Sequence, residues 1–179
     1  GVHYLVECTR AIKEKAPNIR IQVQFEPPEN LEDIKYLHEV GVDAVCIHLE
    51  SFSQEIREQF TPGKAQISID RYFESFKYAV GIFGRNQVST YVIVGLGDTE
   101  DSIVEGCRQV AELGVYPFVV PLRPIMGTPL ENVQAPDPKL MEQIYLRVAK
   151  NNREFDLAYR NSKAGCARCG ACSGIAAFE

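Results

Sequence analysis

Short apolar segments alternate with longer amphipathic segments along the chain, and this pattern predicts strands alternating with helices. Residues 19–25 switch strictly between apolar and polar types, which is the period of a strand with one face exposed. Residues 43–50, 88–94 and 115–122 predict three further strands, and the nearly continuous apolar run at 88–94 is typical of burial on both faces. We therefore expect four strands.

Helices are predicted where apolar residues recur three and four positions apart. The chain opens inside such a pattern, and others cover residues 31–40, 70–83, 99–113 and 138–150. Helix-starting residues precede them: Asn30, Ser68 or Asp70, Asp98 or Thr99, and Asp137 before Pro138. Gly41 and Gly114 stand where a helix ends with positive φ. Residues 51–69 are expected to form a long connection.

This order of elements favours a parallel sheet covered by helices through right-handed crossovers. An eight-stranded barrel takes about 250 residues, whereas this chain has 179. The sequence therefore predicts an α/β fold. It is either part of a TIM-type parallel barrel with its helices outside or a small open doubly wound sheet.

Composition excludes several classes of protein. Apolar residues make up 45% and charged residues 24% of the chain, as in ordinary globular domains. No apolar stretch approaches the roughly 18 residues that a membrane-spanning helix needs. The net charge is −5, and no run of Lys or Arg forms a basic stripe. We therefore expect neither a membrane nor nucleic acid as a partner.

Three of the six cysteines, Cys166, Cys169 and Cys172, stand close together near the C-terminal end. They are too close for a spread disulfide framework, and soft thiolates at this spacing can surround one metal centre. The pattern favours metal binding in a reducing compartment, so we expect a cytoplasmic protein. An iron–sulfur cluster, zinc with a fourth protein ligand, and a thiol tail without metal all fit the pattern.

Polar residues near the strand ends are candidates for chemistry, because the active sites of parallel barrels collect at the carboxyl ends of their strands. Gln22, Gln24 and Glu26 would line the interior from the first strand, unless that strand is an edge whose polar side faces water. Arg123 ends the fourth strand. We assign Gln22, Gln24 and Arg123 to the substrate side of the site.

The second predicted strand carries a histidine and a carboxylate on its polar face. A carboxylate such as Glu50 can accept hydrogen bonds from ribose hydroxyl groups, and His48 lies two residues away, although a lone histidine is often structural. Residues 95–99 (GLGDT) follow a strand and open a helix, so their backbone can approach a ligand closely. Glu100 replaces the third glycine of a dinucleotide fingerprint, and an ordinary capped turn has the same pattern.

Taken in order, residues 1–135 resemble the radical S-adenosylmethionine (SAM) enzymes, especially their biotin synthase-like branch. Residues 47–51 (IHLES) resemble the fourth barrel strand of that branch, and residues 91–98 (YVIVGLGD) resemble its fifth-strand G-x-I-x-G-x-x-E motif. The second match is partial, because Tyr91 replaces the first Gly and Asp98 replaces the Glu. Residues 120–130 resemble the sixth strand and its turn. Residues 61–64 (TPGK) and 160–166 are similar to a radical SAM family encoded in nitrilase gene clusters.

The resemblance implies a partial radical SAM barrel over residues 1–135, followed by a C-terminal helix and a Cys-rich tail over residues 136–179. It implies SAM contacts from these residues: His48, Glu50, Gly95, Leu96, Gly97, Asp98 and, beside the adenine, Ile125. A reduced [4Fe–4S] cluster would cleave SAM to a 5′-deoxyadenosyl radical that abstracts hydrogen from a small-molecule substrate. Electrons would come from an external donor such as flavodoxin or ferredoxin.

The C-x-x-x-C-x-x-C motif that holds this cluster in the family does not occur in the sequence. We therefore expect the chain to be the C-terminal part of a longer enzyme and inactive by itself, the alternative being a complete small protein. The three C-terminal cysteines differ from the motif in spacing and position, so the resemblance implies for them an auxiliary cluster or a zinc site.

Two other functions fit the same residues. The first is a barrel lyase or aldolase, in which His48 and Glu50 act as acid and base. The second is a non-catalytic metal-binding module. One barrel fold supports many chemistries, so the fold does not decide among these functions.

Overall fold

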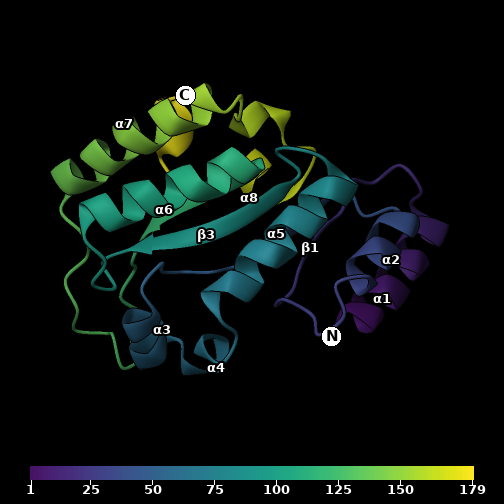
Figure 1. Cartoon of the computed structure of the whole chain (residues 1–179), viewed down its shortest axis with the longest axis horizontal. Coiled ribbons are helices and arrows are strands. Elements are labelled where there is room, and N and C mark those ends of the chain that lie inside the picture. Colours follow the sequence, from purple (N-terminus) through teal and green to yellow (C-terminus); the bar gives the residue numbers. More distant parts are fainter.

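The computed structural model describes residues 1–179, and its centre is an open parallel sheet of four strands. The strands are β1 (Gln22–Gln24), β2 (Ala44–Cys46), β3 (Val88–Val94) and β4 (Val115–Pro121), and they lie side by side in chain order (Figure 1). All three neighbouring pairs are parallel. The predicted α/β fold with a parallel sheet is confirmed. Because β1 and β4 are both edges, the sheet does not close into a barrel.

The second strand is shorter than predicted, and the cause is local. Ile47 N still donates to Ser89 O at 3.0 Å, but the backbone then leaves the regular ladder, since Leu49 N donates to the Thr90 hydroxyl at 3.0 Å instead of to a carbonyl. Glu50 then takes a φ of 71° and rejoins β3 in an isolated bridge to Val92. The detour turns the end of β2 into an irregular segment at the carboxyl edge of the sheet.

The predicted helices are present as α1 (Val2–Lys15), α2 (Asp33–Glu39), α5 (Ile69–Phe83), α6 (Glu100–Leu113) and α7 (Pro138–Glu154). Ser68, Thr99 and Asp137 cap three of them by accepting a backbone N–H, as expected. The prediction for Asn30 was wrong. Its side chain accepts from Glu32 N at 3.1 Å, which forms a turn ahead of the helix, and α2 begins only at Asp33.

The expected long connection at residues 51–69 contains two short helices, α3 (Gln54–Phe60) and α4 (Pro62–Ala65). Ser53 caps α3 by accepting from Ile56 N, and Pro62 occupies the first position of α4. Neither helix is long enough for an apolar period to show in the sequence. The wholly buried side chain of Arg57 holds them together from within.

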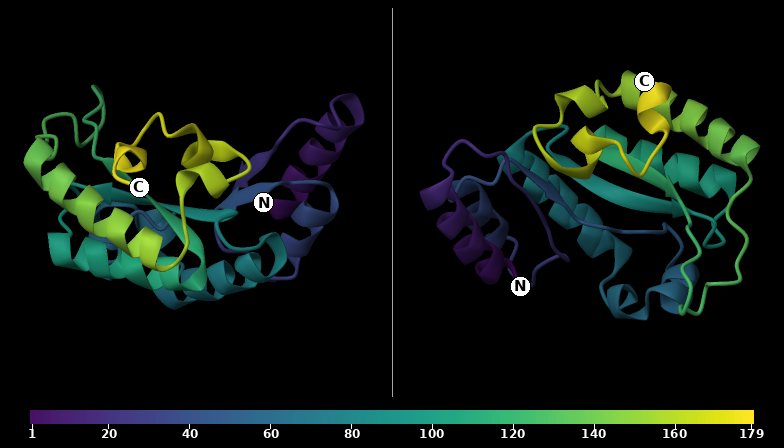
Figure 2. Two further views of the ribbon diagram at one scale, coloured as in Figure 1. Left: turned by 90° about the horizontal axis from the view of Figure 1, so that it is seen from above. Right: turned by 180° about the vertical axis from the view of Figure 1, so that it is seen from behind.

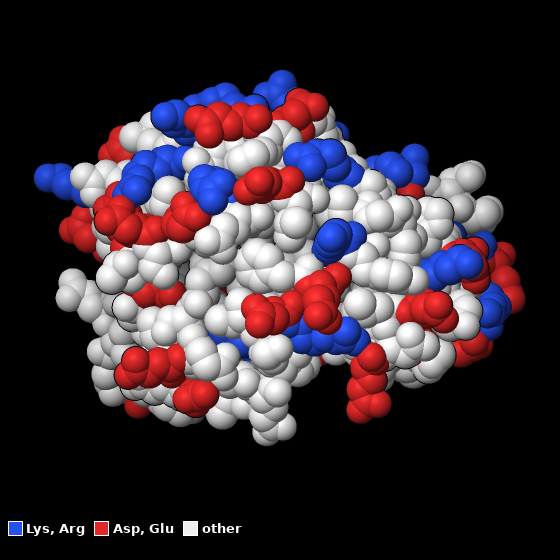
Figure 3. Space-filling view, in the orientation of Figure 1, with Lys and Arg blue, Asp and Glu red and all other residues white.

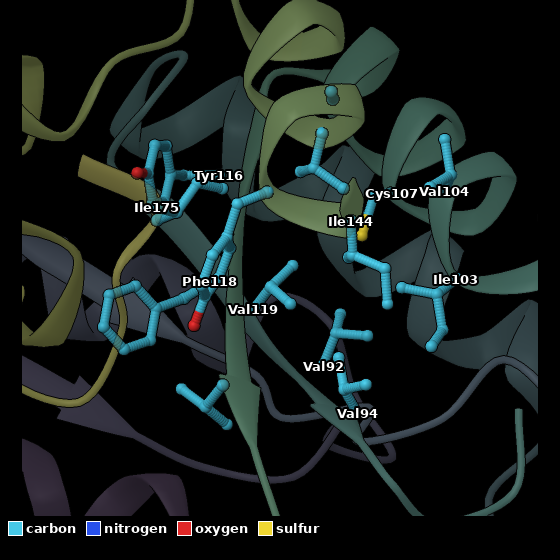
Figure 4. Close-up of a cluster of buried hydrophobic side chains, with 14 of the residues drawn as sticks. Val92, Val94, Ile103, Val104, Cys107, Tyr116, Phe118, Val119, Ile144 and Ile175 are labelled. Carbon is cyan, nitrogen blue, oxygen red and sulfur yellow. The ribbon is translucent and has the colours of Figure 1, made fainter. Parts of the chain in front are cut away.

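Helices cover one face of the sheet, and the C-terminal tail (residues 158–179) lies across the other (Figure 2). The tail contains η1 (Tyr159–Asn161), α8 (Gly165–Cys169) and η2 (Ile175–Ala177). One apolar core fills the space between β3, β4, α6 and α7. Figure 4 shows Val92 and Val119 of the sheet lying beside Ile144 of α7, while Tyr116 and Phe118 lie on the side of Ile175. A second core joins the sheet to α1, α2 and α5.

The tail is anchored by buried polar groups as well as by apolar packing. The Glu179 carboxylate accepts from Tyr116 Oη and Asn152 Nδ2, both at 2.8 Å, and from Tyr159 N at 2.7 Å. Burial, together with the Glu179 charge, raises the pKa of Tyr116, so that its hydroxyl stays a donor. Asn86 Nδ2 donates to Ser162 Oγ at 2.7 Å at the amino end of β3. These bonds fix residues 158–179 against the sheet.

The outer edge of β4 carries two prolines. Leu122 N donates to Val94 O at 2.8 Å, so alternate residues of β4 direct their backbone groups toward β3 and the residues between them direct theirs to the free edge. Pro117 and Pro121 occupy outward positions, where no ladder bond is lost. The outward carbonyl of Val119 accepts from the Ser173 hydroxyl.

No helix combines the length and the apolar composition needed to span a bilayer. Acidic and basic side chains are interspersed over the face seen in Figure 3, without a continuous basic patch.

Candidate functional site

Polar side chains gather on the sheet face opposite α5 and α6, which we call the inner face. The register pairs Gln24 with Cys46 and Cys46 with Ser89, and strand alternation adds Gln22 and Tyr91 to the same face. His48 and Glu50 follow at the carboxyl end of β2, where sites of parallel sheets form. The sequence assigned His48, Glu50, Gln22 and Gln24 to one site, and the structure brings them to one face.

His48 is largely buried, with 19% of its side chain exposed. Its ring stacks on Tyr91 with 4.4 Å between centroids, and its Nδ1 lies 3.8 Å from Glu50 Oε1. Burial, followed by the positive charge of Lys64, lowers the pKa of His48 to about 4, so the imidazole is neutral at pH 7. Its Nε2 is buried and has no hydrogen-bond partner. A buried polar atom without a protein partner is one that a water molecule or a ligand can satisfy.

Glu50 is held by a lysine that the sequence reasoning did not assign to the site. Lys64 Nζ lies 2.5 Å from Glu50 Oε1 and 3.5 Å from Glu26 Oε1, and it donates to the His48 carbonyl at 3.4 Å. The only signal for Lys64 was its place in the TPGK segment. Its position in a stretch without periodicity gave no hint that it would reach the ends of two strands.

Glu26 joins the same network from β1. The buried hydroxyl of Tyr72 donates to Glu26 Oε2 at 2.5 Å, and burial together with this carboxylate raises the pKa of Tyr72. The Arg57 guanidinium lies 4.8 Å from the centre of the Tyr72 ring. Glu26 thus connects the exposed end of the site to the buried Arg57 and Tyr72 pair.

Gln22 and Gln24 contact the inner face and the tail. Gln22 Nε2 lies 3.4 Å from Ser89 Oγ, and Gln24 Nε2 lies 3.9 Å from Cys166 Sγ. β1 is an edge strand, as the alternative reading held, yet the backbone of Gly165 covers the Gln22 side chain. A Cβ at position 165 would stand 2.0 Å from Gln22 Cδ, so another residue would have to move the Gln22 side chain, and the φ of 85° also favours glycine there.

The segment 95–98 has the backbone shape expected of a close-approach turn. Gly95 and Gly97 have φ values of 109° and 130°, and Leu96 is buried. Burial raises the pKa of the Asp98 carboxyl, whose oxygens lie near Ser51 without a well-formed hydrogen bond. Residues 96–99 line a pocket with α3 to which neither His48 nor Glu50 contributes.

Arg123 and Ile125 lie in the exposed loop that follows β4. Arg123 lines a separate pocket with Tyr145 of α7 and Phe178 of the tail. Ile125 is 63% exposed. The structure therefore does not bring either residue to His48 and Glu50, and their roles at the cofactor and substrate stay predictions.

The three C-terminal cysteines are not gathered into a metal site. Cys166 is half-buried beside Gln24 and the Tyr91 hydroxyl, whereas Cys169 and Cys172 are exposed. No group of three or more His, Cys, Asp or Glu side chains is arranged to hold a metal ion. Metal binding by these thiols stays a prediction. Cys46 and Cys107 are buried as expected, and burial raises the pKa of both thiols, while Cys8 is only half-buried.

No protein-family model matches the chain. An uncharacterised protein of Methanocaldococcus jannaschii is 26% identical over 134 residues, which are 70% of this chain and 33% of that protein. The bacteriochlorophyllide c C-7(1)-hydroxylase of Chlorobaculum limnaeum is 22% identical over 159 residues, 85% of this chain and 39% of the hydroxylase. The chain thus spans about a third of the length of these relatives.

Solved structures share the fold at low sequence identity. Coproporphyrinogen III oxidase from Escherichia coli, a radical SAM enzyme, matches with a TM-score of 0.64 and 16% identity over 87% of this chain and 37% of its own. Methylornithine synthase matches with a TM-score of 0.67 and 15% identity, over 98% of this chain and 49% of the synthase. A maturase of the [FeFe]-hydrogenase matches with a TM-score of 0.62 and 16% identity, over 97% of this chain and 53% of the maturase. The chain therefore has a radical SAM-type fold.

Proposed function

We propose that this chain is the C-terminal part of a radical SAM iron–sulfur enzyme that abstracts hydrogen from a small-molecule substrate. The observation that carries the proposal is the partner-free Nε2 of His48, whose Nδ1 lies 3.8 Å from the Glu50 carboxylate, at the carboxyl edge of this sheet. The fold shared with coproporphyrinogen III oxidase supports it. The segments around His48 and Lys64 support the biotin synthase-like branch and a kinship with the nitrilase-cluster family.

The inner face suits the nucleoside part of SAM. A neutral imidazole nitrogen without a partner and a carboxylate can together satisfy vicinal ribose hydroxyl groups. Tyr91, stacked on His48, gives this part of the face an apolar wall that excludes water. Asp98 and Ile125 do not reach this place, so the proposal assigns ribose contacts to His48 and Glu50 alone.

When bound, SAM and a reduced [4Fe–4S] cluster would supply the radical chemistry, and His48 and Glu50 would hold the nucleoside in place against the substrate. Lys64 holds Glu50 by the 2.5 Å ion pair. Gln24 and Cys166, which contact each other across the inner face, form the wall we assign to the substrate. Cys166, Cys169 and Cys172 as they lie do not fit a cluster, so we assign them no step in the reaction. We propose an external flavodoxin or ferredoxin as electron donor.

The test uses the full-length enzyme, reconstituted with iron and sulfide without oxygen. We expect it to bind SAM in a calorimeter and to release 5′-deoxyadenosine under reducing conditions. Glu50→Ala is expected to weaken SAM binding at least tenfold, because a hydrogen bond to a charged group contributes about 1.5–3 kcal/mol. The matched control is Glu14→Ala, an exposed glutamate of α1.

Two results would contradict the proposal. The first is an enzyme that neither binds SAM nor cleaves it. The second is turnover by iron-free protein, which would favour the acid and base chemistry of a lyase or aldolase.

A further inference from the structure

The segment between β2 and α5 places one ammonium group at the ends of two strands. Lys64 Nζ contacts Glu50 Oε1 beyond the end of β2 at 2.5 Å, the His48 carbonyl at 3.4 Å and Glu26 Oε1 beyond the end of β1 at 3.5 Å. The lysine side chain is only 25% exposed. This one side chain therefore links the two sides of the candidate site.

The backbone of Lys64 is fixed by a buried arginine. Arg57 Nη2 donates to Lys64 O at 2.8 Å and to Ile67 O at 3.0 Å, and its Nη1 donates to Gln54 Oε1 at 3.0 Å. Arg57 has no exposed surface and forms no ion pair with any carboxylate. Both Nη atoms of its buried guanidinium are hydrogen-bonded and the group lies against the Tyr72 ring, while its Nε has no partner. The arginine thus shapes residues 61–67 from inside the protein.

The charges show what Lys64 does for the site. Glu50 is 9% exposed, and a buried carboxylate without a cationic partner is strongly disfavoured. Glu26 and Glu50 contact the same ammonium nitrogen, so their nearest oxygens lie within about 6 Å of each other and would repel without it. The neighbouring His48 is neutral at pH 7 and cannot replace that charge.

We propose that Lys64 is a positioning residue that holds and orients the Glu50 carboxylate for the ligand of the inner face, and that Arg57 holds Lys64 in place. The inference rests on the proposed function, because the ligand it concerns is SAM. The inference also assigns a role to the TPGK segment, which turns the chain after α3 and places Lys64 beside Glu50.

The test compares Lys64→Met, Lys64→Arg and the wild type as full-length, reconstituted enzyme. We expect Lys64→Met to weaken SAM binding at least tenfold and to raise KM for SAM more than it lowers kcat. Lys64→Arg, which restores the charge, is expected to recover most of the affinity. Lys35→Met on α2, whose ammonium lies 3.7 Å from Glu39 and far from this network, is the matched control. Melting temperatures show whether each variant folds.

A second measurement does not depend on SAM. The groups that face His48 are Lys64, Glu50, Glu26 and Tyr91. Removing the lysine charge is expected to move the NMR titration of the His48 ring to higher pH in Lys64→Met and to leave it in place in Lys35→Met. An unchanged titration, or wild-type SAM affinity in Lys64→Met, would overturn the inference. Failure of the wild type to bind SAM would instead contradict the proposed function, while the titration still decides the role of Lys64.

Discussion

The buried His48 makes the fold sensitive to acid in a defined pH window. Its pKa is about 4 in the folded protein, against 6.5 for an unperturbed histidine. Between these values the unfolded chain binds a proton that the folded chain does not. Stability is therefore highest above pH 6.5 and falls as the pH decreases toward 4.

The size of the effect follows from the two pKa values. The full shift corresponds to roughly 3 kcal/mol, of which roughly 2 kcal/mol is lost between pH 7 and pH 5. Glutamine cannot take up this proton, so His48→Gln is expected to lack that part of the pH dependence. Other groups titrate in both proteins, and the comparison of variant with wild type cancels their contribution.

Urea unfolding at pH 7 and pH 5 measures the effect. The free energy of unfolding of the wild type is expected to fall by roughly 2 kcal/mol more than that of His48→Gln. His38→Gln, at an exposed position of α2, is the control. Equal losses in the wild type and in His48→Gln would show that the folded protein accepts the proton at this site and would refute the argument from burial.

Two further substitutions test the packing. Gly165→Ala is expected to lower the free energy of unfolding by about 1–3 kcal/mol, because the added Cβ would meet Gln22. Gly170→Ala, also at positive φ but with open space around it, separates the clash from the backbone strain, and equal losses in urea titrations would contradict the proposed contact. Ile144→Ala, in the core, is expected to cost about 2–5 kcal/mol by the same assay. Leu146→Ala, at a half-exposed position, should cost far less, and a similar loss would contradict the assignment of α7's buried face.

The parts of the fold that local chemistry determines were predictable from sequence. Ser68, Thr99 and Asp137 each accept a hydrogen bond from a backbone N–H two or three residues ahead. The residues that determine where α5, α6 and α7 begin are therefore close together in the sequence. The bounds of β3 followed from its apolar run. β2 ended early because Thr90, 41 residues away, supplies a side-chain acceptor to Leu49, which no local pattern contains.

The candidate site was predictable only in part. Alternation along residues 43–50 predicted that His48 and Glu50 share a face, and their side chains do lie 3.8 Å apart, although both residues lie in the irregular segment beyond β2. Lys64 was missed as a site residue because its position depends on the buried Arg57, which hydrogen-bonds to the Lys64 carbonyl. The contact between Gln24 and Cys166 joins residues 142 positions apart, and it depends on where the tail packs rather than on its cysteine spacing.

The prolines on β4 make the two edges of the sheet differ in their ability to pair with a further strand. Pro117 and Pro121 offer no N–H to a strand arriving at that edge, and Ser173 already occupies the carbonyl of Val119. The opposite edge differs, since β1 directs the backbone groups of Gln22 and Gln24 away from β2 and has no strand beside it. The β4 edge is therefore a poor partner for a further strand, whereas the β1 edge leaves its ladder groups free to pair.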